Sequence, residues 1–217
     1  MMTSLFSSFD PASNNLQMNW MFMFSTMMIM PMNFWMKKSR MIFLKKILEK
    51  KLTNDLWNST NNKEMLIFST SLFMMILSMN ILSIFPYTYT PTAQMSISMS
   101  MALPMWLMLM IFGWTIHTNF MFKHLLPSGT PSMLMPMMII IETVGSLIRP
   151  ISLSVRLTAN LIAGHLMMTL LGNINSTNTI MMILPIQTML MMFESTISMI
   201  QAYVFTTLVT LYSSEIP

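Results

Sequence analysis

The sequence of 217 residues contains no cysteine and little charge. The absence of cysteine excludes disulfides, zinc–thiolate sites and thiol chemistry. Charged residues make up 8% of the chain, whereas soluble domains carry roughly 25%, so there are too few charges to solvate a soluble surface. Hydrophobic residues account for 54%. These proportions predict an all-α polytopic integral membrane protein, with room for about five or six spans of roughly 20 residues.

The net charge of +4 comes mostly from residues 37–51, so it reports membrane orientation. Basic and aromatic residues do not alternate as on a nucleic-acid surface, and we predict no nucleic-acid partner. Methionine is abundant, at 34 residues. We favour a mitochondrial genetic code as its explanation over a role as flexible apolar filler. The first residues lack an Arg-rich amphipathic presequence, which fits synthesis inside the organelle.

The first third of the chain contains one predicted span and one basic segment. Residues 19–36 form the span, which a basic cluster ends. Residues 37–52 are predicted as an interfacial amphipathic helix with lysines on one side. The apolar residues that recur at helical spacing on the other side are Met41, Leu44, Leu48 and Leu52. The alternative is a basic loop that only stops transfer. In either case this segment faces the compartment of synthesis, and the N-terminus lies across the membrane.

The rest of the chain is predicted to contain four longer helices. After a polar loop at 54–62, residues 65–85 and 93–122 are spans. Residues 132–171 stay apolar and helical over a length of about 60 Å, twice the roughly 30 Å hydrocarbon core. Either Pro150 divides this segment into two spans, or it is one kinked, tilted helix, which we favour because no loop is present. With residues 180–213 it forms a strongly tilted hairpin.

Polar residues recur inside the two long helices. Glu142, Arg149 and Arg156 are spaced by seven and form one stripe, because each falls about 20° from the last. Asn160 lies near the same face. His165, nine residues after Arg156, points to the opposite face. An arginine at a helix centre costs about 2.5–3.5 kcal/mol on insertion scales, so it requires a reason.

The final helix carries a second stripe, in which Gln187, Glu194 and Gln201 are spaced by seven and Glu215 continues the register. These groups could simply satisfy one another, with Glu194 neutralising one of the arginines. Titratable groups placed along two membrane helices favour a proton path instead. Arginine cannot exchange a proton, so Arg156 would be a fixed charge beside that path.

No metal or cofactor site is predicted. His117 and His124 are spaced by seven but have no second such pair opposite them, so we interpret them as interfacial residues. The sequence contains no phosphate-binding loop, zinc-protease motif or nucleophile elbow.

The segments "SVRLTANLIAGH" and "IQAYVFTTLVTLYSSE" closely resemble the subunit a family of the mitochondrial ATP synthase. "IFPYTYT", "HLLPSGTP" and "IETVGSLIRP" resemble its arthropod form, and the resemblance covers essentially the whole chain. It implies a non-catalytic proton-conducting stator subunit without a cofactor, in the mitochondrial inner membrane. The N-terminus would lie in the intermembrane space and the basic segment on the matrix side. The implied partners are the c-ring, peripheral-stalk and small membrane subunits, protons and lipid.

The resemblance also implies roles for individual residues. Arg156 would face the rotor carboxylates, His165 and Glu194 would line the half-channel from the intermembrane space, and Glu142 the matrix half-channel. Asn160 and Gln201 would lie near the arginine, while Arg149 is either functional or structural. The alternatives are a solute-binding secondary transporter, for which we find no internal repeat, and a structural subunit of a respiratory complex.

Overall fold

The computed structural model describes residues 6, 9–12, 18–29, 39–60, 63–85, 88–126, 129–173 and 180–215. Within these ranges the chain forms seven α-helices and no strand, which confirms the predicted all-α class. The helices are α1 Met21–Ile29, α2 Arg40–Thr60, α3 Lys63–Ser83, α4 Met95–Ile116, α5 Thr118–His124, α6 Met135–Asn173 and α7 Ile180–Ser214. Short 3-10 helices precede α1 (η2, Met18–Trp20) and α4 (η3, Pro91–Ala93).

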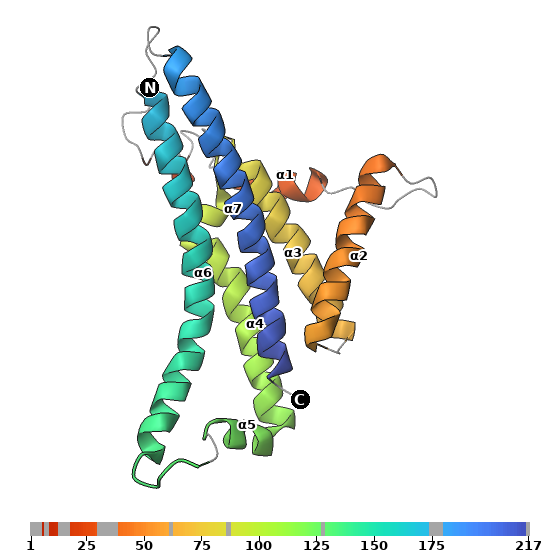
Figure 1. The fold of residues 1–217 in the computed structure, drawn as a ribbon, viewed down its shortest axis with the longest axis vertical. Coiled ribbons are helices and arrows are strands. Elements are labelled where there is room, and N and C mark those ends of the chain that lie inside the picture. Colours follow the sequence, from red (N-terminus) through yellow and green to blue (C-terminus); the bar gives the residue numbers. More distant parts are fainter. Residues whose placement is uncertain are drawn as a thin grey trace.

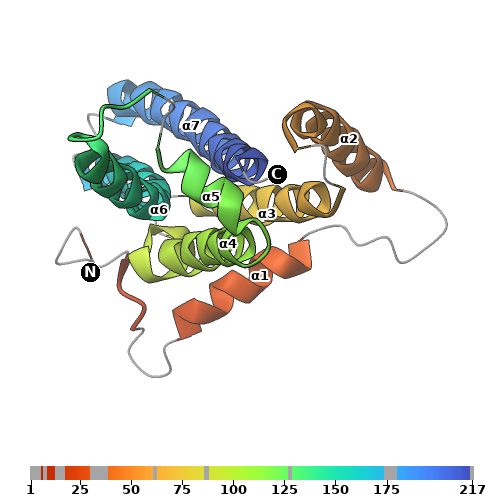
Figure 2. The same ribbon diagram turned by 90° about the horizontal axis from the view of Figure 1, so that it is seen from below.

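The helices form a bundle around a long antiparallel pair. Figure 1 shows α6 and α7 running in opposite directions along most of the molecule. Seen from below, α3 and α4 occupy the middle, α6 and α7 lie on one side, and α1 lies on the other (Figure 2). At the edge of the bundle, α2 packs against α3 and α7.

Four helices in the described ranges are long and apolar enough to cross a membrane: α3, α4, α6 and α7. The chain is therefore a multi-pass membrane protein, as its composition predicts. The first predicted span, 19–36, overlaps η2 and α1, but residues 30–38 lie outside the described residues. That span stays a prediction.

Two predicted boundaries require correction. Helix α2 does not end at Leu52 but continues to Thr60, through residues predicted as loop. The reason is that Leu56 extends the buried face begun by Leu52, and the Thr60 hydroxyl donates to the Leu56 carbonyl at 3.1 Å. The predicted span 93–122 is broken at His117, whose backbone leaves helical geometry (φ −117°, ψ 43°) between α4 and α5.

Helix α6 settles the question that Pro150 raises. Its 39 residues form one helix that passes through Pro150, so the segment is not divided into two spans. Proline removes one backbone hydrogen bond and can kink a helix without ending it. Figure 1 shows that α6 changes direction along its length. Helix α7 likewise passes through Pro185.

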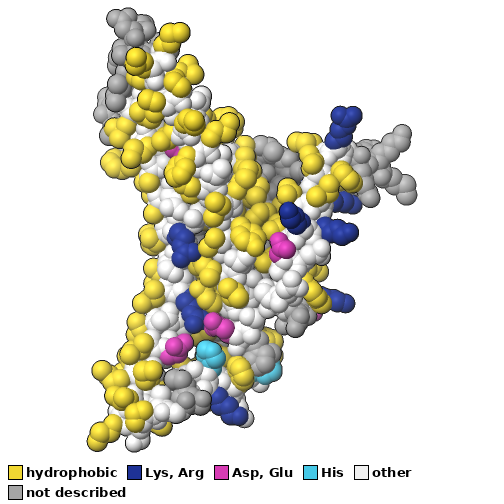
Figure 3. Space-filling model, in the orientation of Figure 1, with side chains coloured by type: hydrophobic (Ala, Val, Ile, Leu, Met, Phe, Trp, Pro, Cys, Tyr) yellow, Lys and Arg dark blue, Asp and Glu magenta, His cyan; other side chains and the backbone are white. Residues whose placement is uncertain are grey.

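The core lies where α3, α4, α6 and α7 meet. Small residues let the helices approach closely there, and Ala102 and Ala202 are almost completely buried. The cluster comprises Leu52, Phe73, Ile76, Ala102, Met105, Leu153, Leu157, Ala202, Phe205 and Val209. By contrast, much of the apolar surface of α6 and α7 is exposed (Figure 3). In a membrane protein such a surface contacts lipid or other subunits.

Candidate functional site

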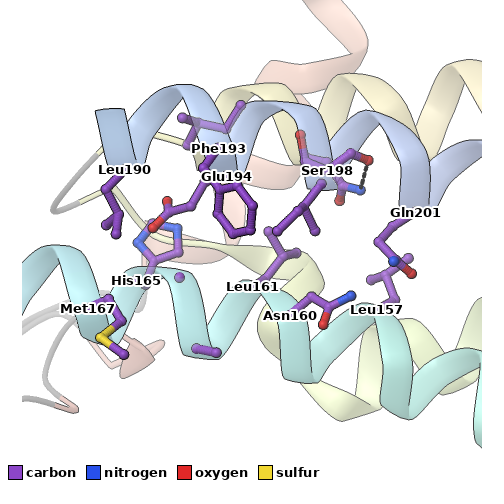
Figure 4. A pocket seen from close by; sticks show the side chains of 15 residues that line it. Leu157, Asn160, Leu161, His165, Met167, Leu190, Phe193, Glu194, Ser198 and Gln201 are labelled. Carbon is purple, nitrogen blue, oxygen red and sulfur yellow. Dashed lines mark hydrogen bonds between the residues drawn. The ribbon is translucent and has the colours of Figure 1, made fainter. Parts of the chain in front are cut away.

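A cavity of about 300 Å³ lies between α6 and α7 and reaches the end of α3. Polar side chains of both long helices reach it, and those of α7 include Glu194 and Gln201, which are spaced by seven on one face. Figure 4 shows His165 of α6 pointing toward Glu194 of α7. The polar lining residues are Asn80, Asn160, His165, Glu194, Ser198 and Gln201.

His165, on the membrane helix α6, is almost completely buried, with 2% of its surface exposed. The ring has the backbone of Ser83, at the end of α3, within hydrogen-bonding reach. The ring of Phe9 packs against it edge-on, with 6.1 Å between the centroids. Its Nε2 has no hydrogen-bond partner among the described residues. A buried nitrogen without a protein partner needs water or another proton donor or acceptor.

Glu194 approaches α6 at a glycine. A Cβ atom added to Gly164 would lie 2.9 Å from the carboxyl carbon of Glu194 and 3.0 Å from Oε1. Any side chain at position 164 would therefore displace this carboxyl group. The buried Oε1 has no hydrogen-bond partner among the described residues. The sequence analysis did not identify Gly164 as a site residue. Its one signal in the sequence is its position directly before His165.

Asn80 is a second residue that the sequence analysis missed. It is buried on α3, where its Nδ2 donates to the Ser198 carbonyl at 3.3 Å and its Oδ1 has no partner in the described part of the chain. Its signal in the sequence is one amide within an apolar span. Since Asn80 lines the same cavity as His165 and Glu194, three helices contribute polar groups to it.

Arg156 lies outside this buried group. Its side chain is exposed on α6, whereas His165 on the same helix is buried, so the predicted opposition of the two residues is reflected in the structure. Among the described residues Arg156 has no ion-pair partner. Asn160 is exposed as well, but it also lines the edge of the cavity. The suggestion that Glu194 neutralises Arg156 is therefore wrong for this chain.

A second polar cluster joins the first part of α6 to the end of α7. Nη2 of Arg149 lies 3.7 Å from Oε1 of Glu142, and its Nη1 donates to Oε2 of Glu215. The guanidinium carbon is 4.9 Å from the ring centroid of Tyr212, in cation–π geometry. Arg149 thus holds two carboxylates and an aromatic ring, and neither carboxylate is Glu194.

Part of the connector between α3 and α4 is also buried. Its residues 89–93 form a continuous buried run that includes η3. Burial raises the pKa of the Tyr89 phenol above its ordinary value, and the neighbouring Gln94 side chain opposes this to a smaller extent. The Tyr89 phenol is therefore protonated at neutral pH.

The structure sorts the predicted site residues into groups. It brings His165, Glu194, Asn160 and Gln201 to one cavity. It does not bring Glu142 there, because that residue belongs to the Arg149 cluster. Figure 3 shows acidic and basic side chains along the otherwise hydrophobic face of the long helices. This arrangement can bind and release protons at two separate places.

Comparison with known proteins identifies the family. Residues 15–214 match the family described as ATP synthase A chain. The ATP synthase subunit a of Locusta migratoria is 46% identical over 224 aligned residues, covering 100% of both chains. Those of Aedes albopictus and Drosophila yakuba are 45% and 46% identical, also over 100% of both chains. This agreement leaves the secondary transporter and the respiratory-complex subunit without support. The chain therefore belongs to the ATP synthase A chain family, whose members are the non-catalytic proton-channel stator subunit of the membrane sector.

Proposed function

We propose that the cavity between α6 and α7 is the inner part of a half-channel that receives protons from the intermembrane space. The observation that carries this proposal is that His165 and Glu194, from two helices, share one cavity with Asn160 and Gln201. An imidazole can both accept and donate a proton, and a carboxyl group can relay a proton when it is neutral. Glu142 lies in another cluster, which supports a separate path for release.

Arg156 is the fixed charge between the two paths and faces the carboxylates of the c-ring. Its exposure and its lack of an ion-pair partner among the described residues support this role. A charge at this position in lipid costs about 2.5–3.5 kcal/mol unless it is paired. A partner carboxylate on a neighbouring subunit would offset that cost. The nearby positive charge favours the ionised carboxylate, so the arriving rotor site releases its proton.

Glu142 lines the matrix half-channel, where released protons leave. It is 40% exposed on α6, and Arg149 holds it beside the end of α7. A carboxylate that is both exposed and held in place can accept a proton from the rotor and pass it to water. We assign Arg149 and Glu215 the task of positioning this carboxylate.

The cycle follows from these positions. A proton passes Glu194 and His165 to an ionised rotor carboxylate, which becomes neutral and can then enter lipid. After rotation the carboxyl group returns its proton near Glu142. Arg156 blocks direct passage between the two paths because its charge repels a proton and its guanidinium does not deprotonate. Each charge crossing 100 mV yields about 2.3 kcal/mol, which drives the rotation.

The orientation belongs to the same proposal. The N-terminus lies in the intermembrane space of the mitochondrial inner membrane, and α2 lies in the matrix-side interface. Exposed Met41, Leu44 and Leu48 on α2 support an interfacial position, since they would face acyl chains. Helix α6, with 39 residues, is about 58 Å long. This length supports a strong tilt along the c-ring. Peripheral-stalk and small membrane subunits would cover other exposed faces.

A density map of the intact ATP synthase that contains this chain tests the proposal. We expect Arg156 to be the residue of this chain nearest to a rotor carboxylate, with the cavity open only toward the intermembrane space. A map in which the rotor faces another side of α6, or in which one continuous channel joins the cavity to Glu142, would contradict the assignment.

A further inference from the structure

The His165 ring is in contact with a residue from the beginning of the chain. The ring of Phe9 packs against it with 6.1 Å between the centroids and an angle of 82° between the planes. This edge-to-face arrangement is one that aromatic rings prefer. Phe9 is not among the described residues that line the cavity between α6 and α7, whereas His165 is. The imidazole therefore adjoins the cavity and, separately, the phenyl ring.

The backbone of Phe9 is fixed to the connector between α3 and α4. Gln94, which directly follows η3 in this connector, donates from Nε2 to the Phe9 carbonyl at 2.8 Å. Helix η3 in turn packs against α6, the helix that carries His165. Because this hydrogen bond is made to the main chain, it would form with any side chain at position 9. The ring contact with His165 is what requires an aromatic side chain there.

A second pair of contacts attaches the N-terminal segment to the bundle. On η2, Asn19 donates from Nδ2 to the Asp10 carbonyl at 3.2 Å. The neighbouring Trp20 ring packs edge-on against the ring of Tyr89, with 6.0 Å between the centroids. Since Tyr89 is a buried residue of the same connector, the segment is attached there at two points. The position of the phenyl ring thus depends on several tertiary contacts.

Phe9 covers a polar ring with an apolar one. His165 is almost completely buried, and its Nε2 has no hydrogen-bond partner among the described residues. A phenyl ring cannot supply that partner, because it has neither a donor nor an acceptor of the ordinary kind. It can, however, decide how the imidazole is turned. The last torsion of a histidine side chain has only broad preferences of its own, so neighbouring groups select its value.

We infer that Phe9 is a positioning residue for His165. Its ring sets the orientation of the imidazole and keeps water from the side that it covers. A half-turn of the imidazole would put carbon atoms where the nitrogens were, and carbon does not relay a proton. With the orientation fixed, His165 exchanges protons with the groups of the cavity and not through the N-terminal segment. This inference rests on the proposed role of His165 in proton uptake.

Chemical modification of histidine tests the contact without measuring proton flux. In intact ATP synthase, diethyl pyrocarbonate reacts with accessible imidazoles, and mass spectrometry separates His165 from the two other histidines of the chain. We expect Phe9→Ala to raise the modification rate of His165 toward that of the exposed His124, whose own rate stays unchanged. Phe9→Tyr keeps the ring and should keep the original rate. Phe6→Ala is the matched control, because Phe6 is 63% exposed in the same segment.

Proton uptake by vesicles that contain the reconstituted enzyme tests the positioning role. Phe9→Ala should lower potential-driven uptake about tenfold, because the imidazole loses its fixed geometry. Phe9→Tyr should restore uptake, whereas Phe9→Leu keeps apolar bulk without the flat ring and should restore less. This comparison keeps the test valid if the alanine variant assembles poorly. Gln94→Leu should lower uptake by itself but add nothing to Phe9→Ala, since the ring that it helps to place is then absent.

The outcomes separate this inference from the proposed function. If Phe9→Ala leaves the modification rate of His165 unchanged, the ring does not cover the imidazole and the inference is wrong. If modification is faster but uptake equals that of Phe6→Ala, Phe9 does not position the histidine. If Glu194→Gln leaves uptake unchanged, the proposed uptake path is wrong, and the modification rates still report the contact. Faster modification, together with uptake that is lost in Phe9→Ala and restored in Phe9→Tyr, establishes the positioning role.

Discussion

Gly164 of α6 and the Glu194 carboxyl group of α7 lie so close together that a Cβ atom at position 164 would displace the carboxyl group. The added atom would lie 2.9 Å from the Glu194 carboxyl carbon. Because position 164 on α6 has no side chain, the Glu194 carboxyl group of α7 can occupy the space beside it. This carboxyl group shares a cavity with His165. In the proposed uptake path, its position would determine whether a proton can pass between the two.

We predict that Gly164→Ala lowers proton-driven ATP synthesis by about 10- to 100-fold, since misplacing a reacting group by 1 Å has effects of this size. Gly145→Ala is the control on the same helix, because nothing lies within 4 Å of its added Cβ. Adding Glu194→Asp shortens the opposing side chain and should restore part of the activity. Equal activity of the two alanine variants would show that the close approach has no functional effect.

Glu194→Gln should slow proton uptake about 100-fold, because it removes a group that can exchange a proton while keeping its shape. Proton flux through the reconstituted enzyme, measured with a pH-sensitive dye, checks this. Glu64→Gln, at the exposed start of α3, changes the same chemistry away from the cavity and should have no effect. Unchanged flux through Glu194→Gln would remove this residue from the path.

Arg156→Lys should abolish coupled ATP synthesis although the charge is formally kept. Lysine lacks the planar guanidinium and deprotonates more readily when desolvated, so it blocks leakage poorly. The measurement is ATP synthesis together with passive proton leak in assembled enzyme. Arg40→Lys, exposed at the start of α2, is the matched control. Normal synthesis with Arg156→Lys would exclude the proposed role.

Arg149 should act together with the carboxylates it holds. We expect Arg149→Gln and Glu215→Gln each to weaken the attachment of the end of α7 to α6, because both break the same contact. A double-mutant cycle on the free energy of unfolding, derived from thermal unfolding of the two single variants and the double variant, should give a coupling of about 0.5–3 kcal/mol. Additive effects would mean that the pair contributes no coupling. ATP synthesis should fall less with Arg149→Gln than with Arg156→Lys.

Much of the architecture could be predicted from the sequence. Helix lengths follow from apolar runs and the fixed rise per residue, so the spans on α3, α4, α6 and α7 were found in order. The wrong predictions concern helix ends, namely the end of α2 and the break between α4 and α5 at His117. Helix ends depend on local contacts such as the buried Leu56, which a hydropathy pattern does not contain.

The candidate site was predictable only in part. Polar residues in membrane helices are costly, so Arg156, His165 and Glu194 could be identified without a structure. Gly164 and Asn80 could not, because a glycine before a histidine and a single amide in an apolar span are signals too weak to interpret until their neighbours are known. The partners of Arg149 also required the structure. The sequence allowed several pairings among the charges, and packing selected Glu142 and Glu215.

The sequence by itself determined that the chain is a membrane protein, which helices are long, and that Arg156 and His165 occupy opposite faces of one helix. These properties depend on composition and helical periodicity, which are local. Only the tertiary structure decided that His165 and Glu194 share one cavity, that Arg149 joins α6 to the end of α7, and that residues 89–93 between α3 and α4 are buried. Those contacts join residues distant in the chain, so they exist only once the helices have packed.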